Sequence, residues 1–229
     1  TETPGQPLGA DALGGRGHEN VTSAGMPGLR TPLVPPVSVT RMALSRLRFW
    51  PASTLPDDAL LAAAYRESPV TSLDYSFNKN AAWNRARDLL LSDVSSAKQT
   101  ILDIGCHTGL FLAGLPPRWR RYGIEIGDGP RRLAFEQHGV EIIADRIESV
   151  SADWNGRFDV VTLFDVFEHL VFPLECLRRA SDLVRSGGRL IISTSDMDAW
   201  TWRVTSGQHW YLQTPLHLSF GSRYFFRQI

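Results

Sequence analysis

The sequence predicts an α/β fold, a doubly wound and mostly parallel sheet with helices on both faces. From residue 100 onward, short apolar runs alternate with segments whose apolar residues recur at helical spacing. A turn that carries Gly105 and Gly109 directly follows the first of these runs. Strands that alternate with helices in this way are joined by crossover connections, which give a parallel sheet covered on both faces.

Five apolar runs are the expected strands, and three segments between them are the expected helices. Each run has the length of a strand and is bounded by glycine or polar residues. The last expected helix should end at Ser186-Gly187-Gly188, which is typical of a helix C-cap. The expected strands cover residues 100–104, 122–126, 140–144, 158–164 and 189–194, and the expected helices cover 108–115, 130–138 and 173–185.

The first part of the chain differs in composition from this core. Residues 1–40 are roughly a third glycine plus proline, with almost no aromatic residues, and are predicted to be a disordered leader. Residues 41–97 are expected to form N-terminal helices that pack on the core or cap it, and the core itself is expected over 98–229. These helices are expected from Arg41 to Trp50, from Pro56 or Asp57 to Arg66, and from Asn80 to Leu91.

Composition narrows the classes of partner. The 24 acidic and 24 basic residues give no net charge, so we expect neither a nucleic-acid partner nor a charged membrane surface. No apolar run approaches the ~20 residues that a membrane span needs. The two cysteines, Cys106 and Cys176, form neither a disulfide framework nor a zinc pattern, which favours a reducing, cytoplasmic setting. The sequence does not indicate an oligomeric state.

The turn between residues 104 and 110 has the features of a nucleotide cradle. Glycines at 105 and 109 permit positive φ angles and leave room for a ligand beside the backbone. The first amide groups of the following helix point toward the carboxyl end of the strand, where ligands bind in sheets of this kind. An ordinary strand-to-helix turn is the alternative.

Acidic residues stand at the ends of four successive expected strands. Asp103 closes the first, and Glu125 closes the second, twenty positions after Gly105, the spacing at which an acid accepts from ribose hydroxyls. Asp145 follows the third strand, where a carboxylate can accept from an adenine amino group, and Asp165 ends the fourth. The sequence therefore predicts a site for a nucleoside ligand at this edge of the sheet.

In these residues the chain resembles the Rossmann-like S-adenosylmethionine-dependent methyltransferases. The resemblance covers residues 98–195, and more weakly to about 222. The first motif of the family corresponds to Asp103–Gly109, its ribose-binding acid to Glu125 in YGIEI, and its adenine-side acid to Asp145 in IIADRIESV. The stretch FDVVTLFDVFEHL is similar to the subgroup that contains ubiquinone-biosynthesis O-methyltransferases, and GGRLIISTSD matches the fifth strand.

The resemblance implies methyl transfer from S-adenosylmethionine to a small-molecule acceptor, at an oxygen atom, with S-adenosylhomocysteine as the product. It implies that His169 is the base that removes the acceptor's hydroxyl proton and that His217 faces the acceptor; a structural histidine is the alternative for His169. A divalent cation at Asp165, Glu168 and His169 is a second, less favoured interpretation. The implied cofactor residues are Asp103, Gly105, Cys106, Thr108, Gly109, Glu125, Asp145, Arg146, Ile147 and Asp165.

Two departures from the family pattern keep alternatives open. His107 stands where the family has its central glycine, so either the loop turns its side chain away, which we favour, or cofactor affinity is weakened. The antiparallel strands that usually follow the fifth strand are expected to be missing, through truncation or a different end to the sheet, which would expose an edge. An NAD(P)-dependent oxidoreductase and a non-catalytic Rossmann-like domain are the alternative functions.

Overall fold

The computed structural model describes residues 50–51, 63, 65–66, 80–92, 98–205, 208–214 and 216–229. The chain divides into two compact units, residues 1–36 and 37–229, and all described residues belong to the second. The predicted leader and residues 41–49 of the helix expected over 41–50 lie outside the described residues, and its last residue, Trp50, belongs to a strand and not to a helix, because it pairs with Phe220. Of the helix expected to end at Arg66, residues 63, 65 and 66 are described and all three are helical.

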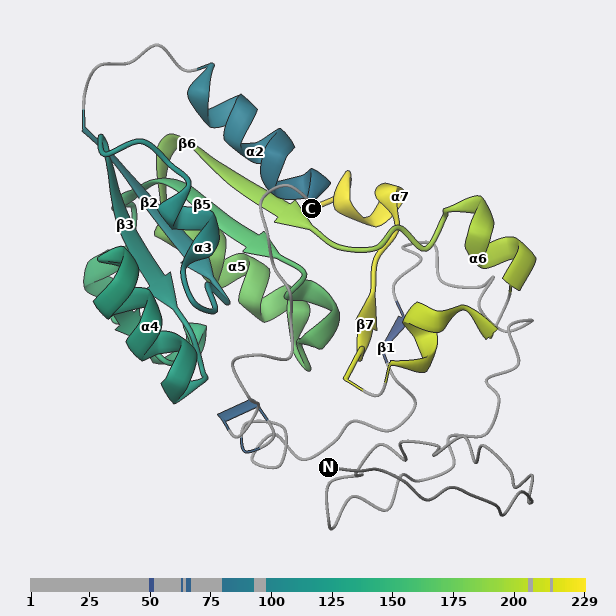
Figure 1. Ribbon diagram of the computed structural model, residues 1–229. Coiled ribbons are helices and arrows are strands. Elements are labelled where there is room, and N and C mark those ends of the chain that lie inside the picture. The colour runs from purple at the N-terminus through teal and green to yellow at the C-terminus, as the bar shows by residue number, and fades with distance from the viewer. Residues whose placement is uncertain are drawn as a thin grey trace, which may run out of the picture. The chain divides into compact units, whose positions relative to one another are not determined.

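Five parallel strands form the central sheet in the order β4-β3-β2-β5-β6 (Figure 1). From β2 the chain continues through β3 and β4 to one side of the sheet, and β5 and β6 are then added on the other side of β2. The point between β2 and β5 is therefore the switch point where ligands bind in doubly wound folds. The predicted fold class and all five expected strands are confirmed, four of the strands with shifted ends and β5 with the expected ones. The strands are β2 (Gln99–Ile104), β3 (Trp119–Ile124), β4 (Glu141–Ala144), β5 (Phe158–Phe164) and β6 (Val184–Ser193).

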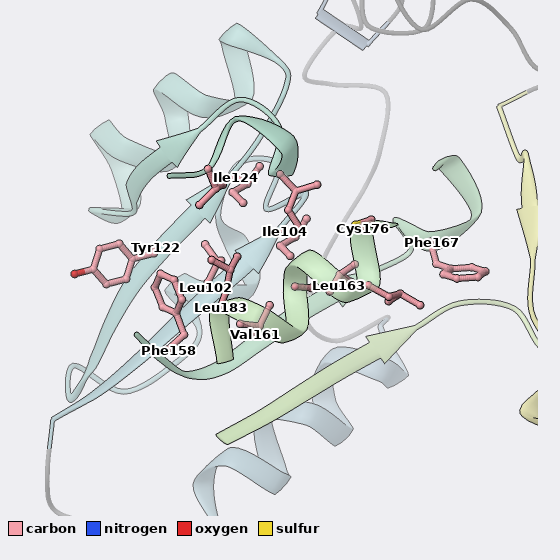
Figure 2. Packing of buried hydrophobic residues seen from close by; sticks show 14 of the residues in the cluster. Leu102, Ile104, Tyr122, Ile124, Phe158, Val161, Leu163, Phe167, Cys176 and Leu183 are labelled. Carbon is pink, nitrogen blue, oxygen red and sulfur yellow. The ribbon is translucent and has the colours of Figure 1, made fainter. Parts of the chain in front are cut away.

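Helices cover both faces of this sheet, and each face has its own apolar cluster. On one face, α2 (Ala81–Leu91), α3 (Leu110–Ala113) and α4 (Asp128–His138) contribute to a cluster that includes Ile101 and Val160 of the strands. On the other face, α5 (Pro173–Leu183) packs against Leu102 and Leu163 (Figure 2). Alternate residues of one strand therefore serve opposite clusters, as burial on both faces requires.

Local sequence explains where two of these helices begin and end. The Asn80 side chain accepts from the Trp83 N–H at 3.0 Å and caps α2. Pro173 stands in the first turn of α5, where its missing N–H costs nothing. The expected end of this helix at Ser186 is wrong, because Val184 already pairs with Phe158 as the first residue of β6.

The segment after β6 forms short elements. These are α6 (Trp200–Thr205), the 3-10 helix η8 (Trp210–Gln213), β7 (Ser219–Phe220) and α7 (Arg223–Phe226). Strand β7 pairs antiparallel with β1 (Trp50–Pro51) in a separate two-stranded sheet. In the part of the chain that the structure describes, no strand pairs with the outer edge of β6. A groove of about 1330 Å³ lies along that edge, between α2, α5 and α7.

Among the helices that the structure describes, none combines the length and the apolar character that crossing a bilayer demands.

Candidate active site

The carboxyl ends of four neighbouring strands carry the four acids singled out from the sequence. Asp103 is the penultimate residue of β2, Glu125 directly follows β3, Asp145 follows β4 and Asp165 follows β5. Because the strand order is β4-β3-β2-β5, the acids stand along one edge in the order Asp145, Glu125, Asp103, Asp165. Neighbouring strands lie ~4.8 Å apart, so each acid is one strand spacing from the next.

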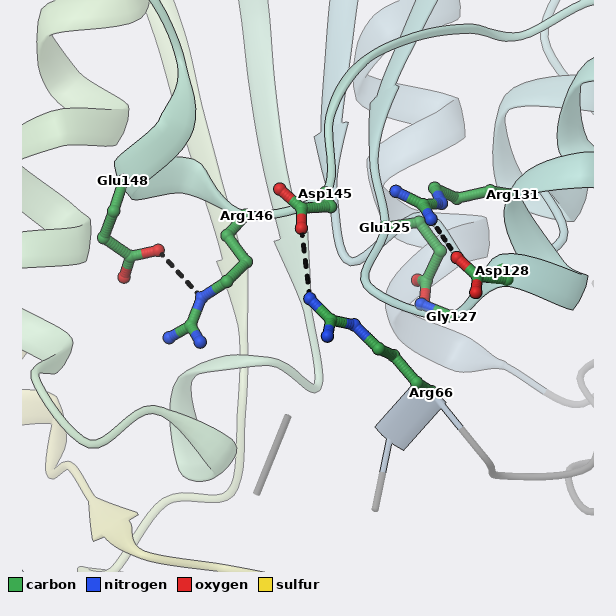
Figure 3. Close-up of polar contacts among 8 residues, drawn as sticks. All are labelled: Arg66, Glu125, Gly127, Asp128, Arg131, Asp145, Arg146 and Glu148. Carbon is green, nitrogen blue, oxygen red and sulfur yellow. Dashed lines mark hydrogen bonds and ion pairs between the residues drawn. The ribbon is translucent and has the colours of Figure 1, made fainter. Parts of the chain in front are cut away.

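Glu125 connects the glycine turn to the end of β3 through hydrogen bonds. Its Oε2 accepts from the His107 N–H and its Oε1 accepts from the Gly127 N–H, both at 2.8 Å (Figure 3 shows the second pair). Gly105 and Gly109 have φ angles of 74° and 78°, and a Cβ on Gly105 would lie 2.5 Å from the Val166 side chain. Each carboxylate oxygen of Glu125 keeps a second lone pair, so the acid can still accept from a ligand hydroxyl.

His107 adopts a φ of 48°, in the left-handed region that favours glycine. The turn therefore keeps its shape with a histidine at the position where the family has glycine. The ring is half-buried, and this burial lowers the pKa of His107, so the imidazole is neutral near pH 7.

Two of the acids hold protons unusually tightly. Asp103 is buried and accepts from Thr162 Oγ1 at 2.6 Å, and burial, aided by the negative charge of Glu125, raises its pKa to about 7. Burial and the neighbouring Glu168 raise the pKa of Asp165 to about 6. Its backbone has a φ of 55°, and its side chain accepts from Ser193 Oγ at 3.3 Å. A cation bound between these carboxylates would lower both pKa values.

Cys106 lies in the same turn, and burial raises the pKa of its thiol well above the usual range. The thiol is therefore unreactive, and its contribution to a ligand site is limited to packing and its backbone.

The predicted adenine-side residues follow β4. Asp145 Oδ2 lies 3.5 Å from Arg66 Nη2, and Arg146 Nε lies 3.5 Å from Glu148 Oε2 (Figure 3). Ile147 begins the 3-10 helix η4 (Ile147–Ser149) and is buried in the cluster that α5 covers. Asp145 therefore already has a cationic partner, which comes from the N-terminal segment.

His169 and His217 meet beyond the end of β5. His169 ends the 3-10 helix η6 (Phe167–His169), and the centroids of the two rings lie 4.8 Å apart. His169 Nδ1 lies 3.0 Å from the Leu216 carbonyl oxygen, and His217 Nδ1 lies 2.8 Å from that of Tyr211. A carbonyl only accepts, so both rings carry a proton on Nδ1 and, when neutral, a lone pair on Nε2. Burial lowers the pKa of His169, which keeps this ring neutral near pH 7.

Glu168 ties the C-terminal segment to this histidine pair. Its side chain is buried and accepts from Tyr211 Oη at 2.5 Å and from Thr194 Oγ1 at 2.9 Å. Its backbone carbonyl accepts from the Leu218 N–H at 2.6 Å. Burial, together with the adjacent Glu168 charge, raises the pKa of Tyr211, so its hydroxyl remains a donor.

Glu168, His169 and His217 each offer one ligand atom, and these three atoms lie within 4.8 Å of one another. One carboxylate and two imidazole nitrogens fit a divalent transition metal. This grouping differs from the trio considered from the sequence, because His217 replaces Asp165. In the part of the chain that the structure describes, it is the grouping whose geometry suits a metal ion.

Sequence reasoning missed several of these partners. Thr162 and Thr194 are polar residues within or directly after an apolar strand, and that interruption was an available signal. Tyr65, Arg66 and Tyr211 gave no such signal, because their partners lie 104, 79 and 43 residues away in the sequence.

A doubly wound sheet with a glycine turn and acids at its strand ends defines a Rossmann-like domain for a nucleoside-containing ligand. A family model described as a methyltransferase domain matches residues 75–229, and the chain belongs to this family. Family membership disfavours the oxidoreductase interpretation.

Curated relatives match less than half of the chain. The ubiquinone biosynthesis O-methyltransferase of Stutzerimonas stutzeri is 33% identical over 107 residues, which are 44% of this chain and 46% of that protein. The protein of the same description from Pseudomonas paraeruginosa is 33% identical over 104 residues, 43% of this chain and 45% of that protein. The chain spans about half the length of the curated relatives it matches.

Solved structures share the fold at low identity. The plantazolicin methyltransferase BpumL in complex with SAH superposes with a TM-score of 0.54 at 18% identity, over 73% of this chain and 71% of that one. A methyltransferase from Thermotoga maritima, described as dependent on SAM and as a possible histamine N-methyltransferase, gives a TM-score of 0.50 at 18% identity, over 64% and 67%. These likenesses support the Rossmann-like methyltransferase fold.

Proposed function

We propose that this chain transfers a methyl group from S-adenosylmethionine to a hydroxyl oxygen of a small-molecule acceptor. One observation carries the proposal: the glycine turn and four strand-end acids share a sheet edge with His169, a neutral imidazole with a lone pair on Nε2. The relatives described as O-methyltransferases support an oxygen acceptor.

The cofactor would lie along this edge in a defined direction. Glu125 would accept from the ribose, and Asp145 and Arg146 would flank the adenine, whereas the Ile147 side chain is buried in the core cluster and leaves only its backbone for the ligand. The backbone of the turn from Gly105 to Gly109, with Cys106 and Thr108, would line the middle of the ligand. Asp103 and Asp165 would face its cationic methionine end, where a positive charge compensates the buried Asp103 carboxylate and the partly buried Asp165 carboxylate.

The reaction is a displacement at the methyl carbon. The acceptor oxygen would form a bond to that carbon while the carbon–sulfur bond breaks and its electron pair returns to the sulfur, which leaves S-adenosylhomocysteine. His169 Nε2 would take the hydroxyl proton, and His217 would lie beside the same acceptor. The protein's main contribution is position, because the cofactor supplies the reactive carbon.

Two experiments test this function. Isothermal titration of the chain with S-adenosylhomocysteine and with NAD⁺ should show binding of the first alone; binding of neither would favour a non-catalytic domain. Transfer of a labelled methyl group to a panel of phenols, catechols and sugars should then identify an acceptor class. Failure of every acceptor despite tight cofactor binding would contradict oxygen methylation of these classes.

A divalent cation at Glu168, His169 and His217 is a second candidate feature, favoured by the convergence of their ligand atoms within 4.8 Å. A bound cation would lower the pKa of an acceptor hydroxyl. Titration with Mn²⁺ should then give a binding isotherm that His217→Ala abolishes and that His138→Ala, remote on α4, leaves intact. Without binding, the base role of His169 is the remaining interpretation.

We also propose a cytoplasmic setting for this chain. The buried free thiols of Cys106 and Cys176 support it.

A further inference from the structure

Tyr65 and Arg66 are successive residues in the sequence, yet they contact two separate parts of the candidate site. Tyr65 Oη lies 2.7 Å from His169 Nδ1, and the two rings meet edge to face with centroids 5.8 Å apart. Arg66 Nη2 lies 3.5 Å from Asp145 Oδ2 (Figure 3). Both residues are helical.

The strand order fixes where these two residues must lie. Asp145 follows β4 and His169 follows β5, and β3 and β2 lie between those strands. Three strand spacings separate the two contact points, which is ~14 Å. A tyrosine and an arginine on adjacent residues reach both points if their backbone crosses the carboxyl ends of β3 and β2. These are the strand ends that carry Glu125 and the glycine turn, where the cofactor would bind.

The Tyr65 contact also has a defined direction. The Leu216 carbonyl oxygen, 3.0 Å from His169 Nδ1, can only accept, so the proton is on Nδ1. The Tyr65 oxygen at 2.7 Å from the same nitrogen is therefore a second acceptor for that proton. Two acceptors on one ring nitrogen hold the imidazole in one tautomer and one orientation, with the lone pair on Nε2.

We propose that Tyr65 is a positioning residue: with the Leu216 carbonyl it holds the His169 proton on Nδ1, so that Nε2 faces the acceptor as a base. Arg66 holds this segment in place across the cofactor site through its contact with Asp145. The inference rests on the proposed function, because the role of Nε2 is that of the base in methyl transfer. Tyr65 itself acts through His169 and not on the acceptor.

The direct test reads the tautomer of His169 by ring ¹⁵N NMR on the full chain labelled at histidine, with His169→Gln to assign the signals. The wild-type protein should show His169 protonated on Nδ1. In Tyr65→Phe, which lacks the second acceptor, the two ring nitrogen shifts should converge toward those of exchanging tautomers. Tyr224→Phe is the matched control, because Tyr224 is exposed on α7, and it should leave the His169 signals unchanged.

Two results would overturn the proposal: a wild-type ring protonated on Nε2, or His169 shifts in Tyr65→Phe that equal those of the wild type. The first needs no variant, so the test survives a variant that fails to fold. With an identified acceptor, Tyr65→Phe should lower kcat about tenfold with the KM for S-adenosylmethionine unchanged. Titration of the wild type with S-adenosylhomocysteine separates the two claims. If the wild type does not bind this ligand, the proposed function is contradicted. If it binds the ligand but the His169 shifts in Tyr65→Phe equal those of the wild type, only the role of Tyr65 is contradicted.

Discussion

The cofactor side and the acceptor side of this site are built in different ways. On the cofactor side, the Glu125 carboxylate accepts from backbone groups 18 and 2 residues away, and the acids stand on consecutive strands. On the acceptor side, His169 and Glu168 are held by residues 26 to 104 positions distant. The first side depends on strand ends and one turn, whereas the second depends on how the N- and C-terminal segments fold back onto the sheet. Proteins of one family can therefore share the cofactor side and differ on the acceptor side.

The largest expected effect separates the two sides by function. His169→Gln should lower methyl transfer by ~10²–10⁴-fold, since it removes the base while the glutamine keeps the approximate size of the ring. Binding of S-adenosylhomocysteine should stay at the wild-type affinity, because three of the four strand-end acids belong to other strands and Asp165, at the end of β5, keeps its own contact with Ser193. Initial rates and titration of the same preparation measure both quantities. Unchanged turnover would leave His169 a structural residue.

The same contrast explains what the sequence could predict. Asp103, Gly105 and Glu125 follow from spacing within a strand–turn–helix–strand unit, and each strand run was apolar enough to be recognised. The end of α5 could not be predicted, because pairing of Val184 with Phe158 overrode the glycine signal that follows it. Nor could the contacts of Glu168 and His169, since no local pattern connects residues so far apart in the sequence.

The next effect concerns stability on the cofactor side and its dependence on pH. Asp103 has a pKa of about 7 in the fold against 3.8 as its ordinary value. A raised pKa means that the folded chain binds the extra proton, so its stabilising contribution is complete below about pH 4 and is lost as pH rises through 7. Asp103→Asn should remove this loss, which amounts to at most about 4 kcal/mol.

Urea unfolding at about pH 5 and about pH 8 measures this pH-dependent loss of stability. The wild type should lose more of its free energy of unfolding between these two values than Asp103→Asn does. The variant should also bind S-adenosylhomocysteine weakly, because the cationic end of the ligand loses a carboxylate. An equal loss in both proteins would show that Asp103 is ionised throughout.

A third prediction tests whether Glu125 holds the turn before any cofactor binds. Glu125→Ala leaves the His107 and Gly127 N–H groups without their acceptor and should cost ~2–3 kcal/mol in the free energy of unfolding. Glu141→Ala is the matched control. Glu141 is an exposed acid of β4 that pairs with Arg120, and such a pair is worth at most ~1 kcal/mol. Equal destabilisation of the two variants would mean that the turn is held by its glycines alone.

The smallest expected effect decides the orientation of His107. His107→Gly removes a strained left-handed residue, which costs ~1–2 kcal/mol, but adds backbone entropy to the unfolded chain worth ~0.5–1 kcal/mol. A net gain of at most about 1.5 kcal/mol in the free energy of unfolding is therefore expected. Because we expect the ring to point away from the cofactor, the affinity of the His107→Gly variant for S-adenosylhomocysteine should equal that of the wild type.

The alternative for His107 has a different signature in the same titration. If the ring projects into the cradle, the glycine variant should bind S-adenosylhomocysteine more tightly than the wild type, and part of the cofactor side would then vary as the acceptor side does. Gly105→Ala shows the opposite limit. Its Cβ would lie 2.5 Å from the Val166 side chain, so both stability and binding should fall together. The comparison would then show that position 107 tolerates a side chain that changes cofactor affinity, whereas position 105 does not tolerate one.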